Sequence, residues 1–167
     1  MENRRQLIIA RHGKSSWKYD KISDIDRHLK ERGIHDAYAM AERLKQSNIS
    51  PDLIMSSPAT RALHTAMIFI RTLNHPLEQV QLHDIFYNGN DQDVLDVIQQ
   101  APENVSTLMI FGHNPTFTDL ANQFLSGELD NLPTAGMAFL EFETAQWQEI
   151  KKSQVVREWT DSPKKKH

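Results

Sequence analysis

The chain has 167 residues, 39% hydrophobic and 25% charged, a composition typical of a globular domain and unlike that of collagen-like, low-complexity or broadly disordered chains. Its 19 Lys and Arg against 22 Asp and Glu give a formal net charge of −3, without the basic excess that typifies nucleic-acid-binding proteins. The chain has no cysteine, which excludes disulfides and thiolate chemistry, and no apolar run approaches the roughly 20 residues of a membrane span.

The hydrophobic pattern predicts alternating strands and helices. Short apolar runs indicate buried strands, and apolar residues at helical spacing between charges indicate helices. In chain order we expect a strand at 7–10, a polar loop at 14–30, a helix at 34–44, a strand at 52–55, a helix at 59–73, a short strand or extended loop at 80–86, a helix at 91–100, a strand at 105–111, a helix at 115–125, and a strand at 137–142 with 147–150 as its candidate partner.

This alternation with short connections predicts an α/β fold of three layers, α/β/α, with a mostly parallel central sheet. We expect a single domain over residues 1–167, with its core at about 6–150 and a frayed, solvated tail at 160–167. In such sheets ligands bind beyond the carboxyl ends of the strands. The residues that follow the predicted strands are therefore the candidates for function.

Two arginines and two histidines occupy these positions, namely Arg11, His12, Arg61 and His113. The planar fork of an arginine matches the oxygens of a phosphoryl group and stays charged at any working pH. A neutral imidazole can attack phosphorus, carry the group and release it to water. Helices that begin near residues 58 and 115 would aim free N–H groups at the same anion. The pattern predicts a phosphoryl-group site.

Three motifs carry a resemblance to a known family. The segment 7–17 (LIIARHGKSSW), the segment 56–66 (SSPATRALHTA) and the segment 112–115 (GHNP) occur in this order and resemble the signatures of the histidine phosphatase superfamily, also called the phosphoglycerate mutase-like fold. Residues 26–37 (DRHLKERGIHDA) are similar to the small bacterial branch typified by the SixA phosphohistidine phosphatase. The likeness covers the chain from about Leu7 to Phe142.

The resemblance implies that His12 is the nucleophile and is phosphorylated transiently. It implies that Arg11, Arg61 and His113 form the phosphate pocket, that His113 also stabilises the transferring group, and that neither a metal nor a cofactor is used. Many members of the family donate a proton from a glutamate between the second and third motifs. Here Asp84 stands near the equivalent place, either as the proton donor or as a solvated loop carboxylate.

Two further residues have two interpretations each. Ser15 and Asn114 either donate hydrogen bonds to the phosphate or only shape their loops. A zinc site at His12 and His113 is not expected, because the pair lacks the compact spacing and the third protein ligand of such sites.

The favoured function is a metal-independent phosphatase that works through a phosphohistidine at His12, with a protein phosphohistidine as substrate by likeness to the SixA branch. The chain has no long insertion to build a lid, which favours a shallow, open site. One alternative is a small-molecule phosphomonoesterase, acting on a sugar phosphate or nucleotide with Asp84 as acid. Another is a non-catalytic module that binds phosphorylated groups. The short chain disfavours a mutase.

The expected partner is a phosphorylated protein or a small phosphorylated metabolite, with no nucleic acid and no membrane. We expect a cytoplasmic protein, because the N-terminal apolar run is too short for a signal peptide. We expect it to be a monomer or a small homo-oligomer.

Overall fold

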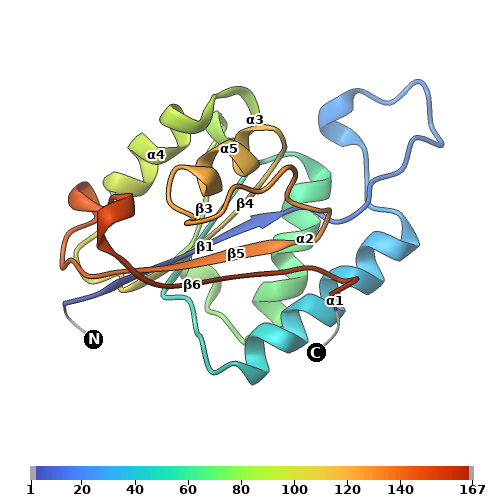
Figure 1. Cartoon of the computed structure of the whole chain (residues 1–167). Helices are drawn as coiled ribbons and strands as arrows, with labels where there is room; N and C mark the ends of the chain where they lie inside the picture. Colours follow the sequence, from blue (N-terminus) through green and yellow to red (C-terminus); the bar gives the residue numbers. More distant parts are fainter. Residues whose placement is uncertain (1–2, 166–167) are drawn as a thin grey trace.

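A computed structural model describes residues 3–165 (Figure 1). Its centre is a six-stranded sheet in the order β3-β2-β4-β1-β5-β6. The strands are β1 (Arg5–Arg11), β2 (Leu53–Ser56), β3 (Val80–Leu82), β4 (Thr107–Gly112), β5 (Met137–Phe142) and β6 (Val155–Asp161). β1, β2, β3 and β4 pair in parallel, whereas β5 pairs antiparallel with both β1 and β6. The sheet is therefore mixed and mostly parallel.

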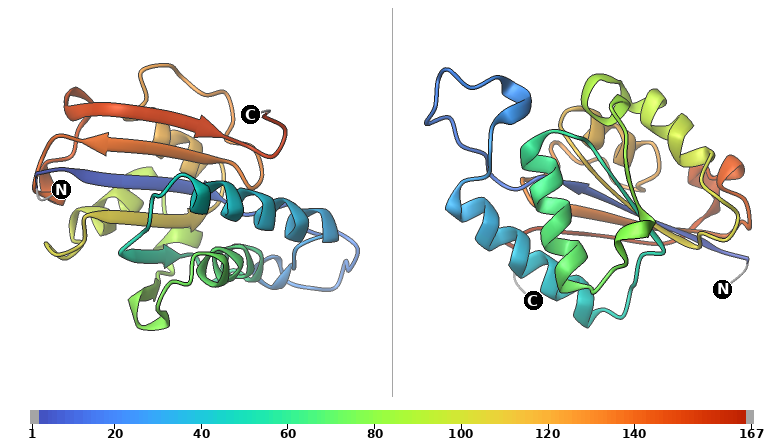
Figure 2. Two further views of the ribbon diagram at one scale, coloured as in Figure 1. Left: turned by 90° about the horizontal axis from the view of Figure 1, so that it is seen from below. Right: turned by 180° about the vertical axis from the view of Figure 1, so that it is seen from behind.

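Helices cover both faces of this sheet (Figures 1 and 2). On one face lie α1 (Glu31–Gln46) and α2 (Thr60–Thr72), and on the other lie α3 (Ile85–Asn88), α4 (Asp91–Gln99) and α5 (Thr116–Asn122). Four short 3-10 turns, η1 (Asp24–Asp26), η2 (Leu77–Gln79), η3 (Trp147–Glu149) and η4 (Lys152–Gln154), lie in the connections. The predicted three-layer α/β/α fold with a mostly parallel sheet is confirmed.

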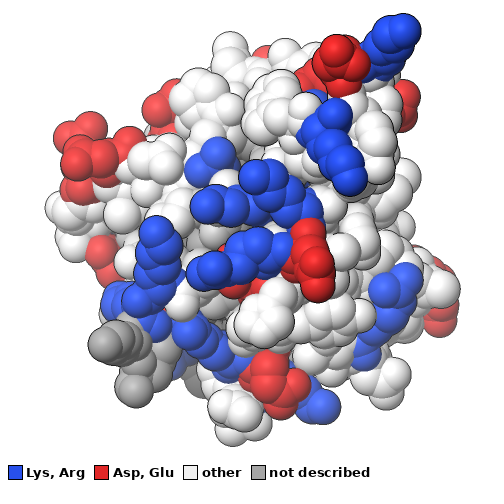
Figure 3. Space-filling view, turned by 90° about the vertical axis from the view of Figure 1, so that its right-hand side faces the viewer, with Lys and Arg blue, Asp and Glu red and all other residues white. Residues whose placement is uncertain are grey.

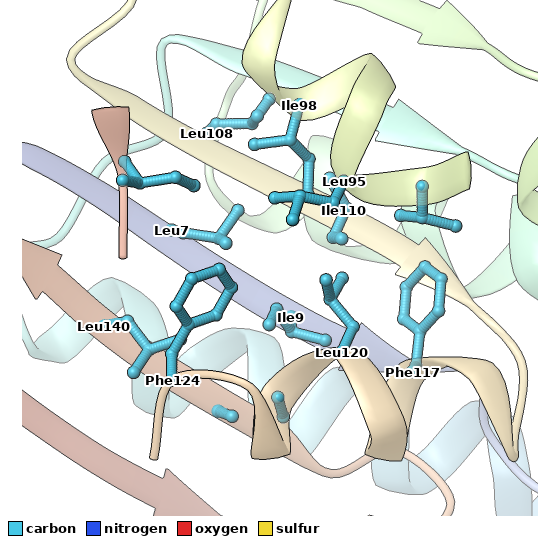
Figure 4. Packing of buried hydrophobic residues seen from close by; sticks show 14 of the residues in the cluster. Leu7, Ile9, Leu95, Ile98, Leu108, Ile110, Phe117, Leu120, Phe124 and Leu140 are labelled. Atoms are coloured by element: carbon cyan, nitrogen blue, oxygen red, sulfur yellow. The ribbon is translucent and has the colours of Figure 1, made fainter. Parts of the chain in front are cut away.

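The central strand β1 shows why the sequence folds in this way. Leu7 and Ile9 belong to the apolar cluster under α4 and α5 (Figure 4), and Ile8 belongs to the cluster under α1 and α2. Successive side chains of a strand point to opposite faces, so a strand with helices on both sides needs an unbroken apolar run. All three side chains are completely buried. The short run that predicted a doubly covered strand therefore lies at the middle of the sheet.

One expectation about the C-terminal part was wrong, and one strand there was not predicted. Residues 147–150 do not pair with β5: they contain the turn η3, whose Trp147 is buried and donates its indole N–H to the carbonyl of Val105 at 2.7 Å. The partner of β5 is β6, which had not been predicted. As an edge strand, β6 pairs on one side only, and its half-exposed sequence VVREWTD gives no continuous apolar signal.

The tail expected to be frayed from residue 160 is ordered at its start. Thr160 and Asp161 are the last residues of β6, and the guanidinium of Arg43 on α1 binds the Asp161 carboxylate at 3.1 Å and the Ser162 carbonyl at 2.8 Å. A strand ladder and an ion pair thus hold a segment that looks solvated in the sequence. The last two residues of the predicted tail, 166 and 167, lie outside the described residues.

The register of the parallel strands determines where the site lies. Arg11 at the end of β1 is opposite Gly112 at the end of β4, and Ser56 at the end of β2 is opposite Phe111. The three strands therefore end at one edge of the sheet. Within residues 3–165, no helix combines the length and the apolar character that crossing a membrane requires.

Candidate active site

The three predicted motifs meet at this edge of the sheet. The backbone N–H of His12 donates to the carbonyl of Gly112, and that of Ser57 donates to the carbonyl of Phe111. The imidazole rings of His12 and His113 are consequently neighbours, with centroids 5.2 Å apart. A cavity of about 350 Å³ lies here, and its lining includes all four of the predicted cationic and imidazole residues, Arg11, His12, Arg61 and His113. The structure thus brings the four candidates together.

His12 has the protonation state that a nucleophile needs. Its Nδ1 lies 2.6 Å from the carbonyl oxygen of Gly13, which can only accept, so Nδ1 carries the ring proton and Nε2 keeps its lone pair. Burial lowers the pKa of His12 to about 4; the bond to Gly13 opposes this, and the charges of Arg61 and Arg11 add to it. At neutral pH the ring is therefore uncharged and able to attack an electrophile.

Gly13 is required for a close approach between backbones. A Cβ atom at this position would lie 2.7 Å from the carbonyl oxygen of Gly33 in the first turn of α1. The N–H of Gly13 donates to the hydroxyl of Thr65 on α2, and that hydroxyl donates to the carbonyl of Arg61. Gly13 therefore fixes the loop that follows His12 against both helices of one face.

His113 is held by a serine from the second motif. Its Nε2 lies 2.8 Å from the hydroxyl oxygen of Ser57, which also accepts a hydrogen bond from the N–H of Ala59. Burial, together with the smaller effects of His12 and Arg61, lowers the pKa of His113 to about 3. Its Nδ1 is buried and makes no hydrogen bond within the described residues. Both rings are therefore neutral near pH 7, so no charge repulsion opposes their close approach.

The two arginines are fixed by different partners. Arg11 donates from Nη1 to the carbonyl of Leu132 at 3.0 Å. Arg61, whose side chain is only 7% exposed, donates from Nη1 to the backbone carbonyl of Asp24 at 2.6 Å and from Nη2 to its carboxylate at 3.0 Å. The Nε atoms of both arginines are buried without a hydrogen-bond partner among residues 3–165. Both side chains are thus positioned from their outer ends.

Asp24 is a residue of the site that the sequence analysis missed. Its carboxylate also accepts a hydrogen bond from the hydroxyl of Tyr87 at 2.6 Å and one from Nε of Arg27 at 3.1 Å. The bond from Tyr87, followed by those from Arg61 and Arg27, holds the pKa of Asp24 well below its usual range, against the effect of burial. Asp24 is therefore an ionised anchor for Arg61 and cannot donate a proton near neutral pH.

Arg27 links the loop at 14–30 to this network. Its guanidinium lies over the indole ring of Trp17, 3.6 Å from the ring centroid, and donates to the hydroxyl of Ser15 at 2.7 Å. Ser15 also lines the cavity, where its hydroxyl accepts this bond. Arg27 was not predicted as a site residue, although it lies in the segment 26–37 that carries the resemblance. Asp24 and Tyr87, which lie 63 residues apart, are outside that segment.

Of the two remaining candidates, Asn114 lines the cavity and Asp84 does not. Asp84 is exposed at the start of α3 and is absent from the residues that line the cavity. Asn114 does line it, but its amide donates to Leu132 and Asn131 and its oxygen accepts from Thr118. These bonds favour the loop-shaping interpretation of Asn114.

The charge of the cavity lining is one-sided. Lys14, Lys30 and Arg27 add to Arg11 and Arg61, and the described residues of the lining include no Asp or Glu. In the part of the chain that the structure describes, no group of three or more His, Cys, Asp or Glu is placed to hold a metal ion. The site is therefore built for an anion that meets several N–H donors at once.

Comparisons with known proteins agree with this geometry. The model of the histidine phosphatase superfamily (branch 1) matches residues 7–107. An uncharacterized chloroplastic protein of Arabidopsis thaliana is 32% identical over 153 residues, which cover 87% of this chain and 70% of that protein.

Two solved structures share the fold over nearly their whole length. A protein of Nakamurella multipartitia assigned as a phosphohistidine phosphatase SixA superposes with a TM-score of 0.82 at 21% identity, covering 97% of this chain and 98% of its own. The protein histidine phosphatase SixA complexed with tungstate superposes with a TM-score of 0.78 at 23% identity, covering 95% and 97%. The family match, the fold and the cationic cavity lead to one conclusion: this chain belongs to the histidine phosphatase superfamily, branch 1, and is a hydrolase of that superfamily.

Proposed function

We propose that the protein removes phosphoryl groups through a phosphohistidine intermediate at His12, without a metal, and that its substrate is a phosphohistidine on another protein. The observation that carries this proposal is a buried, neutral imidazole with a free Nε2, in a cavity lined by arginines and lysines and by no carboxylic acid. The likeness to SixA structures supports the same substrate class.

Catalysis takes place in two displacements. Nε2 of His12 forms a bond to phosphorus while the bond from phosphorus to the substrate's ring nitrogen breaks, and the electron pair leaves with that nitrogen. Water then attacks the phosphorus of the phosphohistidine, the electron pair of the P–N bond returns to Nε2, and inorganic phosphate is released with the oxygen and both protons of the water. Arg11 and Arg61 stabilise the charge on the phosphoryl oxygens in both steps.

The cavity lining favours a nitrogen leaving group. An alkoxide needs a proton from a positioned acid, whereas an imidazole whose second nitrogen is protonated leaves as a neutral ring. The cavity has no carboxylic acid in its lining, Asp84 lies outside it, and Asp24 is held ionised. A phosphoramidate is therefore the substrate that this set of side chains suits best.

The test is to trap the intermediate. The purified protein is mixed with a histidine-phosphorylated protein, quenched within milliseconds, and assayed for a phosphoenzyme that is stable to alkali and labile to acid. We expect this species in the wild type and its loss in His12→Ala, together with a fall in turnover of about 10⁴-fold or more, as is usual for removal of a nucleophile. His35→Ala, an exposed histidine on α1, is the matched control and should behave as wild type.

Four outcomes would contradict the proposal in different ways. Turnover that survives in His12→Ala contradicts the covalent route. Faster hydrolysis of sugar phosphates or nucleotides than of phosphohistidine, dependent on Asp84, favours the phosphomonoesterase. Binding of phosphorylated protein without any turnover indicates a non-catalytic module. A rate lost with a chelator and restored by a metal contradicts the metal-free mechanism.

A further inference from the structure

A second cavity opens beside the catalytic one. It has a volume of about 400 Å³ and its lining includes Lys14, Arg32, Thr134 and Lys164. Lys14 and Thr134 also line the catalytic cavity, so the two cavities adjoin. A substrate whose phosphoryl group lies at His12 therefore has a neighbouring space for another of its groups.

This second cavity is basic although the chain as a whole carries a formal charge of −3. Its lining contains a single carboxylate, that of Asp36, which is already paired with Arg32 at 3.1 Å. Lys14 and Lys164 are exposed, and no carboxylate within residues 3–165 forms an ion pair with either. Two ammonium groups thus remain available to an anionic group of a ligand.

The fold holds Lys164 at this place. Asp161 at the end of β6 is opposite Met137, which is opposite Ala10 next to the catalytic end of β1. The segment beyond β6 is fixed by bonds from Arg43 to Ser162 and by the bond from Nζ of Lys165 to the Thr160 carbonyl at 2.8 Å. The basic C-terminal segment is thus anchored beside the active site.

Figure 3 shows this end of the molecule, where β1 ends. Lys and Arg side chains gather at the centre of the face and continue toward its lower left, and an acidic group adjoins the central cluster. Such a surface attracts an acidic partner and raises its rate of association, to an extent that falls with ionic strength.

We infer that the cavity of Lys14, Arg32 and Lys164 is a subsite for an acidic side chain, an Asp or Glu of the protein substrate that lies close to its phosphohistidine. This inference rests on the proposed function. A second phosphate would need several N–H donors at once, as in the catalytic cavity, but the guanidinium here is paired with Asp36. A carboxylate can be met by the two ammonium groups. The rings of Pro133 and Pro163 line the same cavity and give the stem of the side chain an apolar contact.

The test compares two phosphohistidine peptides that are identical except for Glu or Gln at the positions flanking the phosphohistidine. At low ionic strength we expect the wild type to have a KM about three- to tenfold lower for the Glu peptide, the range of one or two exposed charge contacts. Lys164→Glu should abolish this preference, leave kcat unchanged and leave the Gln peptide nearly unaffected. A peptide with Lys at the flanking positions should regain affinity for this variant.

The matched control is Lys152→Glu, a charge reversal at the start of β6 and hence at the opposite end of the sheet. It should keep the full preference for the Glu peptide. Thermal unfolding of both variants checks that the exposed substitutions leave the fold intact.

The outcomes separate the two proposals. Hydrolysis of both peptides with equal KM in the wild type, or an unchanged preference in Lys164→Glu, overturns the subsite alone. Absence of phosphohistidine hydrolysis by the wild type overturns the proposed function and the subsite with it. A preference for small bisphosphorylated compounds that Lys164→Glu removes would assign the cavity to a second phosphate and overturn the side-chain assignment.

Discussion

The two ends of the central sheet differ in what their charged side chains bind. At the end away from the site, Glu141 accepts from Arg4 at 2.8 Å and from Gln6 at 2.7 Å, and Asp52 accepts from the N–H groups of Ser106 and Thr107. These groups satisfy one another. At the catalytic end, the Nε atoms of two arginines and Nδ1 of His113 are buried without a partner in the described chain.

This difference separates groups that stabilise the fold from groups that serve a ligand. A buried donor or acceptor without a partner costs about 1–3 kcal/mol, so folding alone does not favour such an arrangement. The positive charge that the two arginines bring to the cavity can attract an anion. We therefore expect substitutions at the catalytic end to change activity and substitutions at the other end to change stability.

Arg61→Ala should give the largest effect of the substitutions that test this comparison. Loss of a donor to the charge of the transition state costs about 100- to 1,000-fold in turnover in comparable sites. Steady-state kinetics on a histidine-phosphorylated protein measures the loss, and urea unfolding shows whether the fold persists. Turnover near the wild-type value in Arg61→Ala would contradict a role of Arg61 in stabilising the transition state.

The pH dependence of activity should be displaced far from that of an ordinary histidine. His12 attacks only when neutral, and burial lowers its pKa to about 4, so activity should stay level from pH 7 to about 5 and fall about tenfold per unit below about 4. Phosphoenzyme formation in rapid-quench experiments, corrected for uncatalysed hydrolysis, measures this profile. A midpoint near 6.5 would contradict the burial of the nucleophile.

The same shift has a consequence for stability. In the unfolded chain His12 is protonated near pH 6.5, whereas in the folded chain it is protonated only near pH 4. The unfolded state therefore binds more protons in this window, and the free energy of unfolding should decrease as the pH falls from about 6.5 to 4. Circular dichroism over this range separates loss of fold from loss of the nucleophile.

Asp24→Asn should have a smaller effect than Arg61→Ala. The substitution keeps the shape of the side chain but removes the charge that holds Arg61, and hydrogen bonds to charged groups contribute about 1.5–3 kcal/mol. The Asp24 side chain is half exposed, so solvent screening reduces this and we expect a loss of about tenfold in kcat/KM. Asp26→Asn, an exposed neighbour in the same turn, is the control. An equal loss in both variants would point to the loop fold instead of the contact with Arg61.

Glu141→Gln should have the smallest effect on activity. Burial raises the pKa of this carboxyl, but hydrogen bonds from Gln6 and Arg4 outweigh burial and keep the pKa below its usual value. Removing the charge should lower the free energy of unfolding by about 1 kcal/mol near neutral pH and leave turnover unchanged. A change in turnover without a change in the urea midpoint would contradict the expectation that this end of the sheet affects stability and not activity.

Much of the site was predictable because it follows from local patterns. Short apolar runs located β1, β2 and β4, and the residues directly after them had to meet where parallel strands end together. His12 and His113 are next to such strands, and Arg61 is in the first turn of α2. The parallel pairing of β1, β4 and β2 was enough to bring these three residues to the same edge of the sheet.

Asp24 and Tyr87 were not predictable in this way. Asp24 lies in the long connection between β1 and α1, and Tyr87 lies in a four-residue helix, so no periodic pattern gives the position of either. The hydrogen bond between them at 2.6 Å depends on how two separate connections fold over the same edge. The edge strand β6 was not predicted for a related reason: it pairs on one side only and is half exposed, so its hydrophobic signal is weak.

The sequence by itself determined the layers of the fold and the four side chains that meet in the cavity, because hydrophobic period and strand-end position are local properties of the chain. Only the tertiary structure decided which side chains hold those four in place, which nitrogen of His12 is free, and that Lys164 lines the neighbouring cavity. These features depend on distances between segments far apart in the chain, and such distances are set by packing.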